Sequence, residues 1–162
     1  MRNIVLFRKA RVTETILLTD LTVRSKAYWG YSEHFMEACA NELVVPKETL
    51  ENPSFSYMIV ESKAEVVGYY GLEPASDTEI ELSALFVEPK FIGKGLGKVL
   101  LIHAMNAAIE LGGKELTLQS DPNAEGFYLA NGGVLTGKRE SQSFPGRYLP
   151  TFSISLQGDT HA

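Results

Sequence analysis

The chain has 162 residues, of which 44% are hydrophobic and 22% are charged. This composition supports a real core, so we expect one domain over residues 1–162 with one site. The net charge of −5 argues against nucleic acid or an anionic membrane as partner, because such binders carry a basic excess, whereas a cationic small substrate fits. The lone cysteine, Cys39, permits no internal disulfide and favours a reducing, cytoplasmic compartment. The apolar stretch at 4–7 is too short for a membrane span or a signal peptide.

The hydrophobic pattern of the first half predicts alternating elements, with no repeat and no linker. We expect a strand over 4–9, a helix capped by Thr13 that carries Ile16, Leu17, Leu21 and Val23, a helix over 32–40 capped by Ser32, and a turn at 47–50. Strands over 55–61 and 66–72 follow, joined by a tight connection at Ser62-Lys63, and then a strand over 79–87.

The second half contains the clearest helix of the sequence, which begins after residue 95. Its predicted apolar stripe consists of Leu96, Val99, Leu100, Ala104, Ala107, Ala108 and Leu111. Gly112-Gly113 ends this helix, and a strand over 115–119 follows. Asp121-Pro122 predicts the start of a helix that reaches Ala130, and two closing strands cover 134–139 and 148–156.

The segment between the fourth strand and the long helix reads FIGKGLGK. At this place backbone N–H groups are free and the helix dipole favours an anion. Gly93, Gly95 and Gly97 let the backbone approach phosphate oxygens, while Lys94 and Lys98 add positive charge, so the segment suits a diphosphate. Taken alone it is equally compatible with a flexible turn, because it matches neither the Walker pattern nor the dinucleotide fingerprint.

The sequence LFVEP at 85–89, the glycine loop and the helix after it resemble the coenzyme A motif of the Gcn5-related N-acetyltransferase (GNAT) family. The stretch AEGFY at 124–128, followed by Gly132-Gly133, is similar to the second motif of that family. The resemblance implies a single-domain acyl-CoA N-acyltransferase fold of the α/β (α+β) class. Its mixed, mostly antiparallel and splayed sheet would have about seven strands flanked by about four helices. The chain departs from the family at Ile92, where Gln or Arg is usual.

The resemblance also implies that acetyl-CoA binds as the co-substrate. Backbone groups of Leu85, Phe86 and Val87 would hold the pantetheine arm and the thioester carbonyl, and the same residues also suit a core strand. The diphosphate would contact the loop residues Ile92, Gly93, Lys94, Gly95, Leu96, Gly97 and Lys98. Asn123 is a further candidate for the pantetheine or the ribose, although a helix-start role explains it equally well.

Two residues are candidates for the proton transfers that the resemblance implies. Tyr128 matches the phenol that protonates the departing thiolate, and the alternative is a tyrosine that packs on the sheet. Glu81 matches the base of histone-modifying members, and the alternatives are an exposed carboxylate and a path through water. His34, His103 and His161 are weaker candidates, since His103 falls on the helix stripe and suits a packing role.

Acceptor choice in this family depends on the first two helices and the last loop, which here contain Trp29, Tyr31 and Arg147. These three residues suit either a pocket or packing and surface charge. The function expected is transfer of the acetyl group to a primary amine by direct attack in a ternary complex, with no metal and no acetylated Cys39. A non-catalytic acyl-CoA sensor and a regulatory module for another phosphate ligand are the alternatives. The identity of the amine, the acyl group and a homodimer through the final strands stay open.

Overall fold

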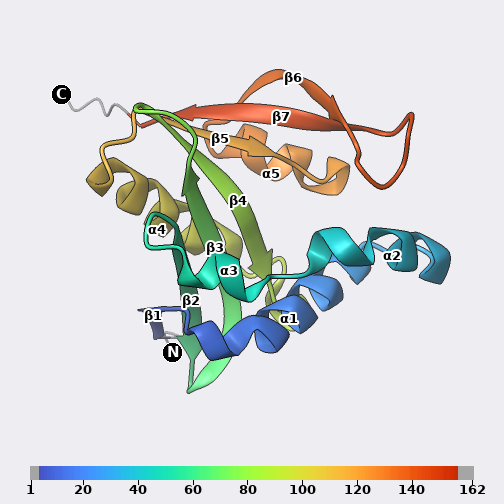
Figure 1. The fold of residues 1–162 in the computed structure, drawn as a ribbon, viewed down its shortest axis with the longest axis horizontal. Helices are drawn as coiled ribbons and strands as arrows, with labels where there is room; N and C mark the ends of the chain where they lie inside the picture. Colours follow the sequence, from blue (N-terminus) through green and yellow to red (C-terminus); the bar gives the residue numbers. More distant parts are fainter. Residues whose placement is uncertain (1–3, 157–162) are drawn as a thin grey trace. The chain divides into compact units, whose positions relative to one another are not determined.

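A computed structural model describes residues 4–156 of the chain and contains one seven-stranded sheet with the order β1-β2-β3-β4-β5-β7-β6 (Figure 1). The strands are β1 (Val5–Lys9), β2 (Ser56–Ser62), β3 (Glu65–Pro74), β4 (Glu79–Val87), β5 (Glu115–Gln119), β6 (Val134–Glu140) and β7 (Tyr148–Ser155). β4 and β5 are parallel, while β1 with β2, β5 with β7 and β6 with β7 are antiparallel. A parallel pair needs a crossover connection, and the long helix between β4 and β5 provides it. The predicted mixed sheet is confirmed.

The α-helices of the described residues are α1 (Thr15–Ala27), α2 (Glu33–Cys39), α3 (Lys47–Glu51), α4 (Leu96–Glu110) and α5 (Glu125–Ala130). The chain forms two compact units. The first unit holds the described residues up to Gly71 together with Ala84–Leu101, and the second unit holds Leu72–Ser83 together with the described residues from Ile102 onward. His161 lies outside the described residues, and the single domain over 1–162 stays a prediction.

The core of the first unit forms where α1 packs on the sheet. Leu18 and Leu21 of α1 are buried in one cluster with Ile59 of β2 and Tyr69 of β3. The Tyr69 hydroxyl donates to Thr22 Oγ1, whose own hydroxyl donates to the Leu18 carbonyl. α1 is thus held on β3 by apolar contacts and by a satisfied buried hydroxyl pair.

Of the apolar residues expected on α1, Leu21 is buried, but the other three are exposed. Ile16 is 74% exposed, and Leu17 and Val23 are exposed as well. The buried residues are Leu18, Leu21, Thr22 and Ser25. Their spacing is that of one helix face, so two small polar residues complete the face that contacts the sheet. A count of apolar residues along the helix therefore selects the wrong side.

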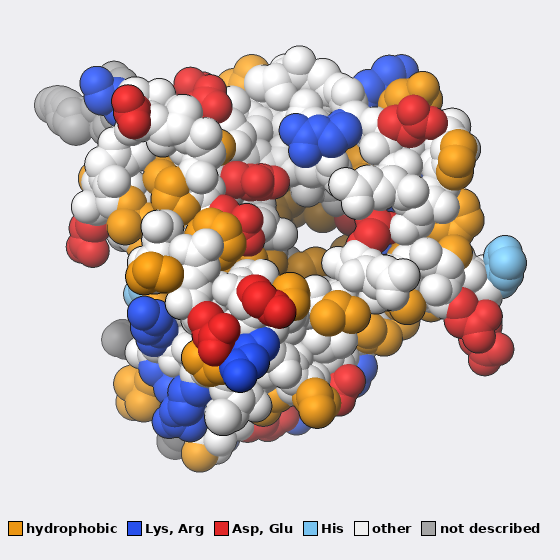
Figure 2. Space-filling view, in the orientation of Figure 1, with side chains coloured by type: hydrophobic (Ala, Val, Ile, Leu, Met, Phe, Trp, Pro, Cys, Tyr) orange, Lys and Arg blue, Asp and Glu red, His pale blue; other side chains and the backbone are white. Residues whose placement is uncertain are grey.

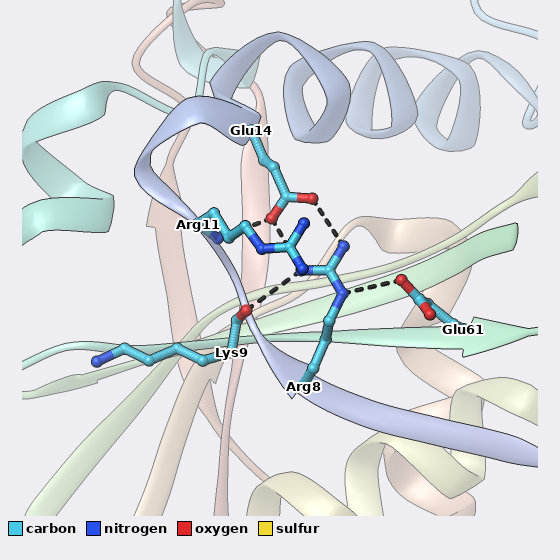
Figure 3. Close-up of polar contacts among 5 residues, drawn as sticks. All are labelled: Arg8, Lys9, Arg11, Glu14 and Glu61. Carbon is cyan, nitrogen blue, oxygen red and sulfur yellow. Dashed lines mark hydrogen bonds and ion pairs between the residues drawn. The ribbon is translucent and has the colours of Figure 1, made fainter. Parts of the chain in front are cut away.

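The start of α1 is set by a charged network rather than by the predicted cap, Thr13, which lies inside a 3₁₀ turn over Val12–Glu14. The Arg8 guanidinium donates to both carboxylate oxygens of Glu14, over 2.9 and 2.7 Å, and to Glu61 over 2.8 Å (Figure 3). Glu14 also accepts the backbone N–H of Arg11 over 2.7 Å. The carboxylate of Glu14 thereby ties the start of the helix to β1 and, through Arg8, to β2.

Two predicted boundaries of the first unit are confirmed with small shifts. Ser32 caps α2, since its hydroxyl oxygen accepts the Phe35 N–H over 3.1 Å. The β2–β3 connection is tight, but its two turn residues are Lys63 and Ala64, with φ of 52° and 65°. Two consecutive positive φ angles are typical of a type I′ hairpin turn, in which Asn and Gly are usual.

The core of the second unit lies on one face of its strands. The buried residues of this face are Ile80 and Leu82 of β4, Leu116 and Leu118 of β5, and Phe152 and Ile154 of β7. The alternate residues Glu79, Glu81 and Ser83 of β4 form the polar face, as the spacing predicts.

α4 ends as predicted. Gly112, with φ of +88°, donates to the Ile109 carbonyl, and Gly113 donates to the Ala108 carbonyl over 2.9 Å. This is a Schellman cap, which requires a residue that tolerates positive φ. The predicted stripe of α4 is confirmed at Leu96, Leu100, Ala104 and Ala108, which are buried, and is wrong at Val99 and Leu111, which are exposed.

Candidate active site

The glycine loop is built from successive turns that lead to the N-cap of α4. Phe91 N–H donates to the Glu88 carbonyl over 2.8 Å, Ile92 N–H to the Pro89 carbonyl over 3.1 Å, and Lys94 N–H to the Phe91 carbonyl over 3.3 Å. The Gly95 carbonyl accepts Val99 N–H, which makes Gly95 the N-cap of α4.

Gly93 and Gly95 have φ of +81° and +87°, and a Cβ atom at either position would meet nothing within 4 Å. Glycine is therefore needed at these two positions for its backbone conformation rather than for space. The N–H groups of Leu96, Gly97 and Lys98, the first three residues of α4, have no carbonyl four residues earlier in the helix. This geometry fits an anion.

Two other loop residues have backbone N–H groups that are already used in hydrogen bonds within the protein. Ile92 and Lys94 already donate their N–H groups to carbonyls of the preceding turn. Ile92 has an apolar side chain that is half-buried, whereas the side chain of Lys94 is exposed beside the helix start. Of these two residues, Lys94 offers an exposed positive charge, and Ile92 offers an apolar side chain.

The last residues of β4 lie beyond its paired part. The parallel register of β4 against β5 covers Glu79 to Glu81. Leu85, Phe86 and Val87 come later on the strand, and the Phe86 ring packs on Tyr69 with centroids 5.8 Å apart. Both interpretations of this segment therefore fit, since its side chains pack in the core while backbone groups beyond the β5 register suit a ligand.

Tyr128 of α5 is a buried phenol. Its side chain packs on Phe127 and Phe152 with ring centroids 5.0 and 5.9 Å away, and the residue is 7% exposed. Within residues 4–156 no hydrogen bond from its hydroxyl is present, whereas the equally buried Tyr69 donates to Thr22. Burial raises the pKa of Tyr128, so the phenol stays protonated at neutral pH and is able to donate a proton.

The backbone of Tyr128 is fixed by the end of its helix. Gly133 N–H donates to the Tyr128 carbonyl over 2.8 Å, and Gly132 has φ of +93°. A Cβ atom on Gly133 would lie 2.7 Å from the same carbonyl oxygen. The glycine pair of the second motif therefore closes α5 and positions the residue that carries the phenol.

Glu81 lies on the polar face of β4, opposite Thr117 of β5. Partial burial raises the pKa of its carboxyl group, the charge of Glu73 raises it further, and Arg139 lowers it. A raised pKa makes this carboxylate a better proton acceptor. Glu73 and Arg139 were not predicted from the sequence. Pairing of β3 with β4 in a hairpin could have predicted that Glu73 lies near Glu81. No local feature of the sequence predicts that Arg139 does.

The other candidates for proton transfer or cofactor contact are Asn123, His103 and His34, and each is exposed or half-buried. Asn123 is exposed, and its backbone N–H and its side chain both donate to Asp121 Oδ1, over 2.8 and 2.9 Å. Asp121, predicted to start a helix, is therefore the N-cap of the 3₁₀ turn Pro122–Ala124. His103 is half-buried on α4, and burial lowers its pKa, while His34 is exposed on α2.

The aromatic residues proposed for the acceptor occupy the segment between α1 and α2. The Tyr31 ring stacks on Phe35 with centroids 4.2 Å apart, and Lys26 Nζ lies 5.0 Å from the Tyr31 centroid. Trp29 is exposed and packs edge-on against Tyr28. The ammonium group of Lys26 thus already lies over the Tyr31 and Phe35 rings.

Arg147 lies in an ordered loop between β6 and β7. The buried Ser141 accepts the N–H groups of Ser143 and Phe144 through its hydroxyl oxygen, over 3.2 Å in each case. Arg147 N–H donates to the Phe144 carbonyl, and the Arg147 carbonyl accepts Ser141 N–H over 2.7 Å. The loop is therefore a fixed structure that presents the half-buried side chain of Arg147.

Residues 4–156 contain no group of three or more His, Cys, Asp or Glu side chains that would hold a metal ion. In the same residues no helix has the length and apolar character needed to cross a bilayer. Figure 2 shows acidic side chains beside basic ones on the face it draws.

The comparisons with known proteins agree with the motifs. The model of the acetyltransferase (GNAT) domain matches residues 17–143 of the chain. The chain belongs to the GNAT family. The match includes the glycine loop, Glu81 and Tyr128, so each of these residues lies within the family's domain.

Two curated relatives match parts of the chain. An uncharacterized N-acetyltransferase, YjgM, of Escherichia coli (strain K12) is 36% identical over 76 residues, which are 45% of this chain and 46% of the relative. A putative [ribosomal protein bS18]-alanine N-acetyltransferase of Bacillus subtilis (strain 168) is 29% identical over 84 residues, 50% of this chain and 55% of the relative. The chain therefore matches about half the length of these curated relatives.

A solved structure shows the same fold at low identity. It is the PaiA N-acetyltransferase from Thermoplasma acidophilum in complex with coenzyme A. Its TM-score is 0.75 at 19% identity, and the alignment covers 94% of this chain and 99% of that one. The expected acyltransferase fold, with its open mixed sheet, is confirmed.

Proposed function

We propose that the protein is an acetyl-CoA-dependent N-acetyltransferase that transfers the acetyl group to a primary amine. The observation that carries the proposal is the GNAT domain match over residues 17–143, which contains a glycine-capped helix N-terminus and a buried phenol without a hydrogen-bond partner in the described residues. The two curated relatives are named N-acetyltransferases, and the structural relative was solved with coenzyme A.

The cofactor role of the glycine loop rests on charge and backbone geometry. First-turn amides of α4, the helix dipole and the exposed Lys94 and Lys98 all favour a diphosphate. Backbone groups of Leu85 to Val87 are proposed for the pantetheine arm and for the oxyanion of the tetrahedral intermediate. The carry-over to Asn123 is weaker, because its side chain is engaged with Asp121.

The proposed reaction is a direct attack in a ternary complex. The amine nitrogen forms a bond to the carbonyl carbon of the thioester, and the carbon–sulfur bond breaks. Glu81, directly or through water, accepts the proton that the ammonium group loses before the attack, and the nitrogen releases its second proton to solvent as the amide forms. Tyr128 donates its proton to the departing thiolate and regains one from solvent afterwards. A covalent route through Cys39 is not supported, because that thiol is buried.

The acceptor is proposed to be cationic before it loses its proton. The net charge of −5 and the carboxylates of Glu73, Glu79 and Glu81 on β3 and β4 favour an ammonium group in the surroundings of the second unit. Trp29, Tyr31 and Arg147 are proposed to select the rest of the acceptor. A screen of amino acids, polyamines and peptide amino ends for release of free thiol identifies the class.

The acid assignment is tested with two tyrosine variants that remove the same atom. We expect Tyr128→Phe to lower kcat about 100-fold, the scale of general-acid catalysis, with little change in acetyl-CoA affinity. Because the lost hydroxyl has no partner in the described residues, the variant should be as stable as the parent.

Tyr69→Phe is the matched control. It breaks the buried bond to Thr22 and should lower the free energy of unfolding by about 1 kcal/mol while kcat is retained. Equal kcat for Tyr128→Phe and the parent with every accepted amine would remove Tyr128 from the mechanism. Thermal unfolding of both variants separates loss of chemistry from loss of fold.

Two other functions make different predictions. A non-catalytic acyl-CoA sensor binds acetyl-CoA but releases no thiol with any amine. A regulatory module for another phosphate ligand is stabilised by ATP or NAD, whereas the proposal requires that acetyl-CoA stabilises the protein and that these nucleotides do not.

The proposal also includes a cellular compartment and an oligomeric state. A cytoplasmic protein fits the lone cysteine, Cys39, which is buried and reduced. A homodimer is proposed through the exposed edge of β6, where a second copy would add a strand. Light scattering after size exclusion measures the mass, and a mass of one chain would refute the dimer.

A further inference from the structure

An ion pair joins the last turn of α1 to the residue that precedes the glycine loop. Arg24 Nε and Nη2 donate to the two carboxylate oxygens of Glu88 over 3.0 and 2.7 Å. A guanidinium that meets a carboxylate through two parallel bonds fixes direction as well as distance. The Arg24 side chain is 50% exposed, but that of Glu88 is only 16% exposed, so the carboxylate has little water to replace its partner.

Glu88 is the first link in the chain of turns that forms the loop. Its N–H donates to the Val67 carbonyl over 2.8 Å, which anchors it to β3, and its carbonyl accepts Phe91 N–H. The Phe91 carbonyl in turn accepts Lys94 N–H, one residue before the N-cap Gly95. Backbone hydrogen bonds therefore connect Glu88 to Lys94, the residue next to the N-cap of α4.

The backbone of Arg24 belongs to the last turn of α1, which leads into residues 28–31. Its carbonyl accepts Tyr28 N–H over 3.1 Å, and the Lys26 and Ala27 carbonyls accept the N–H groups of Trp29 and Gly30 over 3.2 and 3.0 Å. These bonds end α1 and set the direction of residues 28–31, which include the proposed acceptor residues Trp29 and Tyr31.

We infer that the Arg24–Glu88 ion pair is a positioning link that couples acetyl-CoA binding at the glycine loop to the order of residues 28–31. This inference rests on the proposed function, because it takes the loop as the acetyl-CoA site. Ligand binding that fixes the loop also fixes Glu88, and Glu88 then fixes Arg24 and the end of α1. Coupling is reciprocal, so an ordered acceptor segment also strengthens acetyl-CoA binding.

The first test measures the dissociation constant of coenzyme A by calorimetry for Arg24→Gln, Glu88→Gln and the double variant. The two single changes alter the charge near an anionic ligand in opposite directions. A purely electrostatic effect weakens binding in Arg24→Gln and tightens it in Glu88→Gln. A positioning link weakens binding in both, by about fivefold or more.

The double variant separates a shared link from two independent effects. Since both residues act through one contact, the double variant should bind coenzyme A at least as tightly as the single variant with the lower affinity. The exchanged pair, Arg24→Glu with Glu88→Arg, should recover part of the affinity. Tighter binding by Glu88→Gln, or fully additive losses, would overturn the inference.

The second test follows amide hydrogen exchange with and without coenzyme A. In the wild-type protein the ligand should slow exchange of the Tyr28, Trp29 and Gly30 amides, although they are distant in sequence from the loop. Arg24→Gln should abolish this slowing while the amides of the loop stay protected at saturating coenzyme A.

Lys47→Gln is the control, because it removes an exposed pair with Glu51, 3.7 Å apart on α3, and should keep the wild-type pattern. Thermal unfolding confirms that each variant is folded, and Arg24→Lys keeps the charge if Arg24→Gln fails to fold. If wild-type protein does not bind coenzyme A, the proposed function and the inference both fail. If it binds but residues 28–31 do not respond, only the inference fails.

Discussion

At the scale of single residues, burial decides the chemistry of the proposed site. Tyr69 and Tyr128 are both buried phenols, yet only Tyr69 has a hydrogen-bond partner for its hydroxyl in the described residues. An unpaired buried hydroxyl costs free energy, and such costs concentrate where function needs the group. The motif resemblance singles out Tyr128 as the candidate acid, and the surroundings of the two residues show which hydroxyl is engaged with another side chain.

Glu81 leads to a prediction about pH. Its pKa is raised by burial and by Glu73 and lowered by Arg139, so the acid limb of kcat/KM should lie above the pKa of an ordinary glutamate. Activity should rise with pH through this limb, because the base must lose its proton first. Glu73→Gln should move the limb to lower pH, and Arg139→Gln should move it to higher pH.

The measurement is kcat/KM against pH for the parent and these variants with one accepted amine. Glu81→Gln should lower kcat about 100-fold if the carboxylate is the base. A small loss together with an unchanged acid limb would assign the base role to water instead. Opposite shifts in Glu73→Gln and Arg139→Gln are the signature that a general loss of stability does not produce.

At the scale of elements, the ends of helices determine where candidate residues lie. Gly95 begins α4, and the Gly132-Gly133 pair closes α5 directly after Tyr128. Glycine residues in a sequence predict such helix ends, because glycine adopts positive φ without strain and other residues do so at a cost in free energy. The hairpin turn at Lys63-Ala64 has no such signal, which explains why its position was predicted one residue early.

Two alanine substitutions test the closing of α5. Gly133→Ala places a Cβ atom 2.7 Å from the Tyr128 carbonyl oxygen, a backbone atom that has little room to move. We expect a loss of about 2 kcal/mol in the free energy of unfolding and a lower kcat, because the helix end must shift under Tyr128. Chemical denaturation and steady-state kinetics measure the two effects.

Gly126→Ala is the matched control in the same helix. A Cβ atom there would meet nothing within 4 Å, so the change should be neutral or stabilising by about 0.5 kcal/mol, since alanine favours helix. Equal stability of both variants would show that the end of α5 is not as tightly closed as the structure indicates.

At the scale of the whole molecule, the chain divides into two compact units, and the proposed functional residues are shared between them. The glycine loop and the end of β4 belong to the first unit, while Glu81 and Tyr128 belong to the second. We expect acetyl-CoA binding to be measurable as a gain in the stability of the folded chain.

A ligand that binds only the folded state raises the free energy of unfolding by an amount set by its concentration and its Kd. Acetyl-CoA at 100 times its Kd should raise the free energy of unfolding by about 2.7 kcal/mol, and the Tm by roughly 5–10 °C for a chain of this size. ATP and NAD at the same concentrations should leave the Tm unchanged. A larger shift with ATP than with acetyl-CoA would favour the regulatory module over the acetyltransferase.

The sequence by itself determined the order of strands and helices, the glycine loop and the family resemblance, because these depend on neighbours within a few residues. Turn glycines, cap residues and hydrophobic periodicity are local signals of this kind. Tertiary packing alone decided that α1 buries Thr22 and Ser25 instead of Ile16, that the Tyr128 hydroxyl has no partner in the described residues, and that Arg24 meets Glu88. Each depends on contacts between segments far apart in the chain, and burial, charge and hydrogen bonding at a residue are properties of those contacts.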